Sequence, residues 1–282
     1  MKKILLIIAI TFSFNHLCFA YPISKPFPPF RIIGNLYYVG TDDLASYLIV
    51  TPKGNILINA DLPADPPMIQ ANIEKLGFKF SDTKILLISH AHFDHAGGSQ
   101  FIKQKTQAKY WVMDGDVPVV ESGGKLDFQY AQDVNAHFPE SKVDKILHDG
   151  DKVKLGGSVL TAHLTAGHTP GCTTWTMTLI DHKELYHVVI IGSLNVNPGY
   201  KLVNNTVYPD IAKDFEHAFR VSKSLSCDIF LGAHGRFFNL KEKYALMIKK
   251  GRNFFIDPIG YKKYVAKKEK IFYEKLRKQK TP

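Results

Sequence analysis

The sequence has 282 residues and is poor in cysteine, with three in all. Cys18 lies in an apolar N-terminal stretch, so only Cys172 and Cys227 remain in the body of the chain. Two cysteines do not make a disulfide framework, which excludes the small, disulfide-stabilised class of secreted domain. An oxidising compartment would permit a bridge between the two. Neither has an evident partner in its surroundings, and we expect both thiols to be free.

Long hydrophobic runs are absent beyond Ala20. Before it, Lys2 and Lys3 precede an apolar run at residues 4–14 that is too short to span a bilayer comfortably. This pattern is typical of a secretory signal peptide over residues 1–20, with cleavage before Tyr21. A buried N-terminal helix and a lipoprotein cleavage before Cys18 fit less well. We therefore expect the mature protein in the periplasm, with no membrane contact after signal removal.

The sequence also lacks a basic groove with interleaved aromatic residues, the pattern expected of a nucleic-acid-binding protein. Removing Lys2 and Lys3 from the 36 basic residues leaves 34 against 26 acidic ones, a formal charge of +8. Lysines crowd residues 261–280, where apolar residues recur at helical spacing: Tyr261, Val265, Phe272 and Leu276. We expect a solvated C-terminal helix and no nucleic-acid partner.

Internal repeats, low-complexity segments and linkers are absent, so we expect residues 21–282 to form one domain. The run Lys84–Ser89 is short and almost wholly apolar, which favours a strand covered on both faces. Strands in both halves of the chain, each followed by helices, favour two packed sheets with helices outside. Predicted strands lie at residues 33–38, 46–51, 55–59, 84–89, 108–113, 145–147, 152–155, 158–164, 173–180, 187–191 and 228–231. Predicted helices lie at 68–76, 96–106, 210–225, 244–250 and 261–280.

Serine-hydrolase motifs are missing, since the sequence contains neither G-x-S-x-G nor S-x-x-K followed by S-D-N. It contains instead a cluster of potential metal ligands directly after the predicted strand 84–89: His90, His92, Asp94 and His95. Imidazole and carboxylate together suit zinc. One tetrahedral ion cannot use all four from such a tight loop. We therefore expect His90 and His92 to face one ion, and Asp94 and His95 to face another.

Two further histidines follow strand-like runs and lie among turn residues. His168 stands in the segment TAGHTPG and His234 in GAHG, where glycine lets the backbone crowd an ion. Either histidine alone is better explained by a structural role, but joined to the cluster they supply a third ligand for each ion. The other histidines of the mature chain lack such a setting, and we interpret them as surface or core residues: His137, His148, His163, His182, His187 and His217.

On these residues the chain resembles the metallo-β-lactamase superfamily, whose H-x-H-x-D-H motif residues 90–95 match in full. The resemblance extends over nearly all of the mature chain and is greatest to class B β-lactamases of the third subclass. It implies an α/β fold, a four-layer αββα sandwich. It also implies two zinc ions per chain, the first held by His90, His92 and His168 and the second by Asp94, His95 and His234.

The segment 188–200 (VVIIGSLNVNPGY) distinguishes members of this superfamily. Glyoxalase-like thioesterases and lactonases usually carry a metal-bridging aspartate after its glycine, and other β-lactamase subclasses carry a cysteine. This chain has Ser193 there, and a neutral hydroxyl is a poor zinc ligand. We predict that Ser193 and Asn195 bind the β-lactam carboxylate, and that Asn197 and Tyr200 donate to the oxygen that becomes anionic. Residues 197–199 also fit an ordinary turn.

The resemblance implies a zinc-dependent β-lactamase that hydrolyses penicillins, cephalosporins and carbapenems and confers antibiotic resistance. We expect a monomer with a small-molecule β-lactam substrate. Asp94 anchors the second zinc and moves the proton, and Tyr200 assists catalysis. Asp61 is predicted to orient a ligand without touching zinc. The alternative is a periplasmic lactonase or thioesterase on the same fold; a zinc-storage protein fits less well.

Two features of the resemblance concern the periphery of the site. Phe128 and Tyr130, in the aromatic-rich loop 126–139, either wall the pocket or pack within the loop. Several relatives pair a cysteine like Cys227 with another near the C-terminus, where this chain has Tyr261. That family disulfide is therefore expected to be missing.

Overall fold

The computed structural model describes residues 24–281, and the predicted signal peptide at residues 1–20 lies outside them. Two sheets form the centre of the molecule. The first has the order β1-β2-β3-β4-β5-β6-β7, made of β1 (Phe30–Ile33), β2 (Leu36–Tyr38), β3 (Tyr47–Thr51), β4 (Gly54–Ile58), β5 (Thr83–Leu87), β6 (Lys109–Met113) and β7 (Lys145–Leu147). The second has the order β12-β11-β10-β9-β8, made of β8 (Lys152–Leu155), β9 (Ser158–Leu164), β10 (Thr173–Asp181), β11 (Glu184–Ile191) and β12 (Ile229–Gly232).

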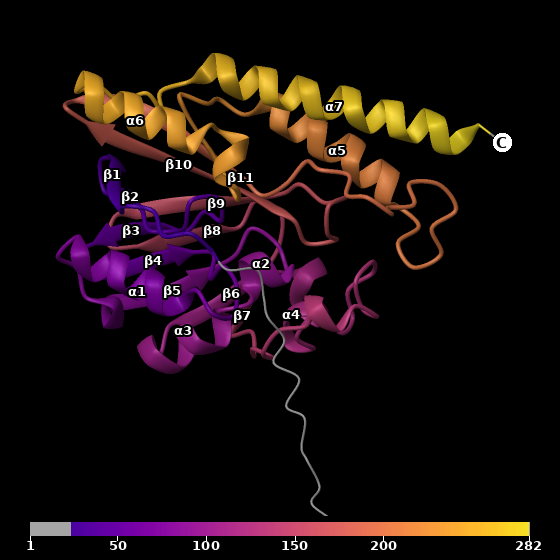
Figure 1. Cartoon of the computed structure of the whole chain (residues 1–282), viewed down its shortest axis with the longest axis horizontal. Helices are drawn as coiled ribbons and strands as arrows, with labels where there is room; N and C mark the ends of the chain where they lie inside the picture. Colours follow the sequence, from indigo (N-terminus) through magenta and orange to yellow (C-terminus); the bar gives the residue numbers. More distant parts are fainter. Residues whose placement is uncertain (1–23, 282) are drawn as a thin grey trace, which may run out of the picture.

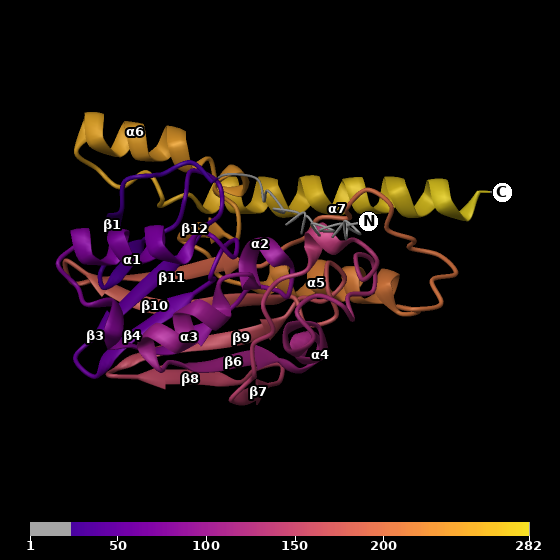
Figure 2. The same cartoon turned by 60° about the horizontal axis from the view of Figure 1, so that its bottom comes forward.

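Helices lie outside both sheets, as Figure 1 shows. The first sheet is covered by α1 (Pro66–Lys75) and α3 (Ser99–Thr106), which Figure 2 shows in front of its strands. The second is covered by α5 (Ile211–Ser224) and α7 (Pro258–Lys280). The shorter helices are α2 (Phe93–Ala96), α4 (Val117–Glu121) and α6 (Leu240–Lys250). The layers are helix, sheet, sheet and helix, so the predicted α/β sandwich is confirmed.

The central strands of the first sheet bury side chains on both faces. In β5, Ile85 and Leu87 point into the core between the sheets, whereas Leu86 belongs to the core under α1 and α3. Side chains alternate along a strand, so a strand covered on both sides must be apolar at every position. The almost wholly apolar run in the sequence is the result of this double burial.

Strand directions bring the chemistry to one edge of the sandwich. β4, β5 and β6 are parallel neighbours in the first sheet, and β11 and β12 are parallel in the second. β9 also runs parallel to β11, because both pair antiparallel with β10. The carboxyl ends of these strands meet at one edge, where ligands gather in open α/β sheets. Residues 88–95, 165–172 and 233–237 leave the strands at this edge.

Several local predictions differ from the structure: the predicted helix 96–106 is divided between α2 and α3, and α6 begins four residues before its predicted start at residue 244. The predicted strand 33–38 is a hairpin between β1 and β2, because the chain reverses at Gly34 with φ +51°, a conformation glycine adopts readily. α1 begins at Pro66, two residues before the predicted start, since proline suits the first turn of a helix. The short helix α4 was not predicted. Within residues 24–281, no helix is long and apolar enough to cross a bilayer.

Candidate metal centre

The loop after β5 is anchored to both sheets before it reaches its histidines. The Ser89 amide donates to Asn59 Oδ1 at 2.8 Å, and the Ser89 carbonyl accepts from the Thr173 amide at 2.8 Å. His90 and His92 follow in extended backbone, and the chain then turns into α2, which carries Asp94 and His95. The loop is thus tied to β4 on one side and β10 on the other.

His90, His92 and His168 form a first trio in which one nitrogen of each ring lies within 4.8 Å of those of the others. Their ring centroids are 4.6–4.8 Å apart. None of the three is more than 7% exposed. Three imidazoles from the two sheets therefore converge on one buried point.

Asp94, His95 and His234 form a second trio beside the first. His95 Nε2 and His234 Nε2 lie 3.2 Å apart, and each is 3.5 Å from Asp94 Oδ2. The His90 and His95 rings, 4.3 Å apart, join the two trios. The structure thus brings together all six predicted ligands.

The outer nitrogen of three of the five rings lies within hydrogen-bond distance of an oxygen, and that of His92 lies near a carboxylate without a hydrogen bond. His90 Nδ1 lies 3.1 Å from Ser89 Oγ, and His168 Nδ1 lies 2.8 Å from the Asn195 carbonyl. His92 Nε2 is 3.6 Å from Asp127 Oδ2, and His234 Nδ1 is 3.1 Å from Asp43 Oδ2. Such contacts fix the ring and aim the other nitrogen at a metal.

Burial keeps these imidazoles neutral. It lowers the pKa of His92 to about 4 and holds the pKa values of His90, His95 and His168 well below their usual range. Burial also lowers the pKa of His234. A metal ligand must present a bare nitrogen, so neutral rings are in the state that coordination requires.

The donor set fits metal ions, and zinc in particular. Close, neutral imidazole nitrogens around a carboxylate oxygen leave lone pairs facing one another, an arrangement that a cation stabilises. Three nitrogens in one trio, and two nitrogens with a carboxylate oxygen in the other, are ligand sets that zinc accepts.

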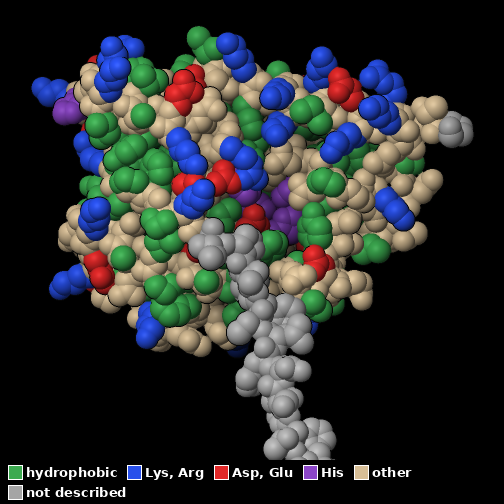
Figure 3. Space-filling model, in the orientation of Figure 1, with side chains coloured by type: hydrophobic (Ala, Val, Ile, Leu, Met, Phe, Trp, Pro, Cys, Tyr) green, Lys and Arg blue, Asp and Glu red, His purple; other side chains and the backbone are tan. Residues whose placement is uncertain are grey.

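Five of the six ligands, all but the buried His95, line a cavity of about 130 Å³. A neighbouring hollow of about 340 Å³ shares Phe93, Asp94, His234 and Arg236 with it and extends the space towards Asp42 and Leu44. Figure 3 shows histidine side chains at the bottom of a hollow in this face, with basic side chains on the side formed by α7. The metal centre is therefore open to a small molecule.

The chain is similar to known proteins over most of its length. A family model described as the metallo-beta-lactamase superfamily matches residues 40–178. The native FEZ-1 metallo-beta-lactamase from Legionella gormanii is 66% identical, covers 93% of this chain, is itself covered in full at 100%, and superposes with a TM-score of 0.92. The chain belongs to the metallo-β-lactamase superfamily. It is thus a hydrolase of that superfamily, as predicted.

Other similar proteins match different shares of this chain. The subclass B3 enzyme BJP-1 of Bradyrhizobium japonicum is 39% identical over 91% of this chain and 96% of its own, with a TM-score of 0.85. The predicted similarity to the third subclass is therefore confirmed. A hydroxyacylglutathione hydrolase of Rhodopseudomonas palustris is 32% identical over 127 residues, which are 45% of this chain and 40% of that protein. The chain spans 37–41% of the length of the first curated relatives that it matches.

The predicted substrate residues of this superfamily member fall into two groups. Asn195 and Asn197 line the metal cavity. Ser193 and Tyr200 do not line it among the described residues, and they are 1% and 2% exposed. Ser193 Oγ accepts the Asn195 amide at 3.3 Å, and the Tyr200 hydroxyl donates to the His168 carbonyl at 2.8 Å. A contact between Tyr200 and substrate would require its hydroxyl to leave that carbonyl.

The two aromatic residues of the loop 126–139 have different surroundings. Tyr130 lines the cavity, where its hydroxyl accepts from Asn197 Nδ2 at 3.1 Å and its ring packs edge-on against His92. Phe128 packs instead against Tyr200 and Tyr208, with ring centroids 5.0 and 5.1 Å away. Tyr130 therefore walls the pocket, and Phe128 supports the wall from behind.

Asp61 follows β4 in the left-handed backbone region with φ +53° and is fully buried. Its Oδ1 accepts from Ser46 Oγ at 2.8 Å, while its Oδ2 has no hydrogen-bond partner among the described residues. Burial raises the pKa of this carboxyl well above its usual range. The side chain contacts Ser46 rather than one of the six predicted ligands in the hydrogen bonds described.

Three residues of the site were not anticipated. Asp43 holds the outer nitrogen of His234, Asp127 lies 3.6 Å from that of His92, and Arg236 lines the cavity while pairing with Asp43. Asp127 lies in a loop without periodicity, and Asp43 is far from His234 in the sequence, so no pattern marked either. Arg236 follows His234 by two residues in a turn, and its proximity to that ligand was the available signal.

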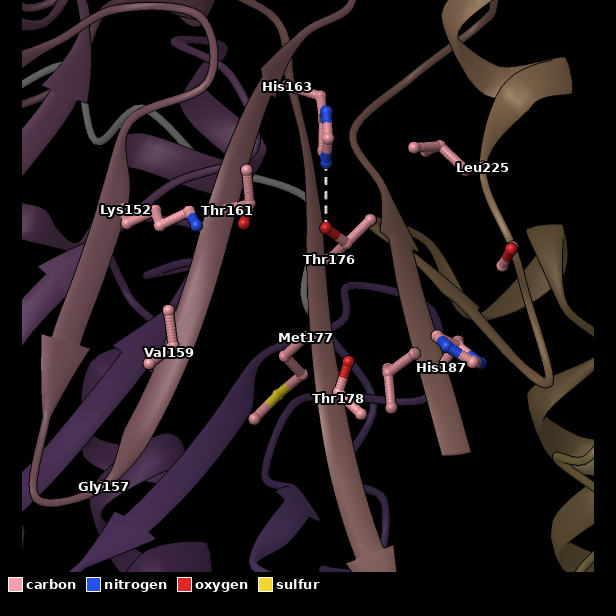
Figure 4. A pocket seen from close by; sticks show the side chains of 12 residues that line it. Lys152, Gly157, Val159, Thr161, His163, Thr176, Met177, Thr178, His187 and Leu225 are labelled. Atoms are coloured by element: carbon pink, nitrogen blue, oxygen red, sulfur yellow. Dashed lines mark hydrogen bonds between the residues drawn. The ribbon is translucent and has the colours of Figure 1, made fainter. Parts of the chain in front are cut away.

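A larger hollow of about 520 Å³ lies on the outer face of the second sheet, away from the metal centre (Figure 4). It contains two histidines, but each is already hydrogen-bonded: His163 to Thr176 at 2.8 Å, and His187 to Asp228 at 2.9 Å. Size alone does not indicate a reactive site, and the smaller cavity carries the convergent ligands.

Proposed function

We propose that this chain is a zinc-dependent β-lactamase that hydrolyses the amide bond of penicillins, cephalosporins and carbapenems and thereby confers resistance to them. One observation carries the proposal: ligands of both trios line one cavity whose wall also includes Asn195 and Asn197. The similarity to FEZ-1 and BJP-1 over nearly the whole chain supports it.

The end of β11 favours this substrate over a thioester. The residue after Gly192 is Ser193, a buried serine whose hydroxyl accepts the Asn195 amide. Gly192 is packed so tightly that an added Cβ would lie 2.4 Å from the Thr173 carbonyl oxygen. Ser193 thus offers no carboxylate to bridge two ions, and the strand end presents neutral hydrogen-bonding groups to the substrate.

Two zinc ions, held by the two trios, would activate water near neutral pH and polarise the carbonyl group. In the reaction, the water oxygen bonds to the β-lactam carbonyl carbon, the C–N bond breaks, and the nitrogen receives a proton. Asp94 is placed to move that proton, since it lines the cavity and its Oδ2 lies 3.5 Å from His95 and from His234.

The chain's other polar groups orient the substrate. The Asn197 amide reaches the cavity beside the Tyr130 hydroxyl and can donate to an oxygen that gains charge. Asn195 borders the same space, and its carbonyl holds His168. We further propose that the enzyme acts as a monomer in the periplasm after removal of residues 1–20, with two zinc ions per chain.

An assay of the purified mature protein tests this function. The substrates are a penicillin, a cephalosporin, a carbapenem, a homoserine lactone and a hydroxyacylglutathione thioester. We expect β-lactam hydrolysis that chelator abolishes and zinc restores. Hydrolysis of the thioester or the lactone, with the β-lactams left intact, would replace the proposal by the alternative hydrolase that the partial similarity to hydroxyacylglutathione hydrolases favours.

A further inference from the structure

A buried carboxylate outside both trios joins the loops that carry the first trio. Asp116 ends the 3-10 turn after β6 and is 1% exposed. Its Oδ2 accepts from the Ala91 amide at 2.8 Å and from the Thr169 hydroxyl at 2.9 Å. Its Oδ1 accepts from the Gly171 amide at 2.8 Å. No water or cation is needed to explain this carboxylate, because three donors of the chain surround it.

The donors are neighbours of metal ligands on two different sheets. Ala91 stands between His90 and His92 in the loop after β5, and Thr169 directly follows His168 in the loop after β9. One carboxyl group therefore connects the first-sheet loop with the second-sheet loop. A change in its position would alter the distance between His168 and the other two rings.

The backbone around the Asp116 carboxylate is tightly packed. A Cβ added to Gly171 would lie 2.4 Å from the Asp116 amide nitrogen, and one added to Gly115 would lie 2.5 Å from the Pro170 carbonyl oxygen. The turn 114–116 and the loop 168–171 therefore interlock through backbone. The hydrogen bonds to Asp116 therefore set the distance between the turn and the loop, because their backbones are in direct contact at Gly115 and Gly171.

The second trio has no equivalent connection. Asp43 accepts from His234 Nδ1 and from the Arg236 amide, which belong to the same loop, and it does not reach His95 in the hydrogen bonds described. Among residues 24–281, only the first trio has a carboxylate that accepts hydrogen bonds from both of its ligand loops.

We propose that Asp116 is a positioning residue that sets the geometry and the metal affinity of the first trio without touching metal or substrate. The inference rests on metal binding by the trios, as in the proposed function, but not on β-lactam hydrolysis. Each ligand loop donates at least one hydrogen bond to Asp116, so weakening the bonds from either loop should loosen the trio.

The test uses cobalt alone. Asp94→Asn provides a background in which the second trio is impaired, so that stepwise Co²⁺ titration of the metal-free mature protein reports the first trio. In that background, Thr169→Val removes one donor to Asp116 and keeps the shape of the side chain. We expect Co²⁺ affinity to fall about 10- to 100-fold, the range found when partners of metal ligands are removed. The ligand-field spectrum should change, and Thr169→Ser should restore both.

Thr106→Val is the matched control, since it removes another buried hydroxyl that makes hydrogen bonds far from the site. Both valine variants should lower the melting temperature of the metal-free protein similarly, but only Thr169→Val should weaken cobalt binding. Equal cobalt affinity and an unchanged spectrum in Thr169→Val would overturn the proposal. Asp116→Asn, if it folds, should have a larger effect than Thr169→Val, and a smaller effect would also overturn it. If the variants bind cobalt as expected but the parent protein hydrolyses no β-lactam, the proposed function is wrong and the role of Asp116 stands.

Discussion

The first trio consists of three imidazoles, none more than 7% exposed, whereas the second includes the Asp94 carboxylate with 24% of its side chain exposed. The carboxylates beside the rings differ in the same way. Asp127, beside His92, is buried, while Asp43, beside His234, is 34% exposed in its side chain and shared with Arg236. The histidines of both trios are buried, but the second, which we call the exposed trio, includes a partly exposed carboxylate, and we expect the first to hold its ion more tightly.

The largest predicted effect comes from the exposed trio. Asp94→Asn keeps the size of the side chain and an oxygen, but removes its charge and its basicity. We expect loss of the second ion and a fall in kcat of about 10²- to 10⁴-fold, the usual contribution of a proton-transferring group. The melting temperature of the metal-free protein should hardly change, because Asp94 is partly exposed. Elemental analysis and Michaelis kinetics check this, and a variant with two zinc ions and the parent rate would show that Asp94 has no proton role.

The second prediction compares the two carboxylates that lie beside the outer ring nitrogens of His92 and His234. Asp127→Asn should lower the affinity of the first trio, and Asp43→Asn that of the second, within the range of about 10- to 100-fold. We expect the larger loss for Asp127, since its contact is buried and unscreened by water. Asp133→Asn, in the same loop as Asp127 but exposed, is the control. Equal losses for Asp43 and Asp127 would remove the distinction between a buried and an exposed trio.

The third prediction concerns the cavity wall. Asn197→Ala should lower kcat/KM for β-lactams about 2- to 13-fold, from a hydrogen bond worth about 0.5–1.5 kcal/mol. Ser193→Ala should have a smaller effect, because the Ser193 hydroxyl does not line the cavity and, among the described residues, hydrogen-bonds only with the backbone N–H of Asn195, which does. Both variants should retain two zinc ions. Loss of an ion from Ser193→Ala would show that Ser193 is a ligand, contrary to our prediction from the sequence.

The smallest effects are expected at the cysteines, which are both unpaired in the described structure. Cys172 is buried near the first trio, with its thiol 3.5 Å from the Ser193 carbonyl, and Cys227 precedes β12, which leads to the second. Burial raises the pKa of Cys227 to about 12, and that of Cys172 further. A thiolate-specific reagent should therefore react slowly with the native protein and find two thiols after denaturation. A count of zero there would reveal a bridge.

The sequence predicted what depends on strand ends and residue types. The six ligands follow buried strands, so their meeting at one edge could be inferred from period and order alone. Asp116 also follows a predicted strand, so the same reasoning places it at this edge of the sheet. Asp43 and Asp127 could not be placed in this way, because their contacts join loops that carry no periodic pattern.

Side-chain direction within a loop was equally hidden from the sequence. Ser193 and Asn195 are two residues apart, yet only Asn195 borders the cavity. Tyr200 and Tyr130 were both candidates for the pocket, and the structure places Tyr130 at its wall and Tyr200 under the His168 loop. Such choices are made by tertiary packing, which neighbouring residues in the sequence do not determine.

The parallel pairing of β12 with β11 has a consequence for how the protein is made. Parallel neighbours require a crossover connection, and here it contains α5, so His234 is synthesised long after the other five ligands. A chain still growing on the ribosome contains His90, His92 and His168 before Ile229 has been added. Biosynthesis therefore separates the two ion sites in time: the ligands of the buried one exist early, and the exposed one is completed only near the end of translation.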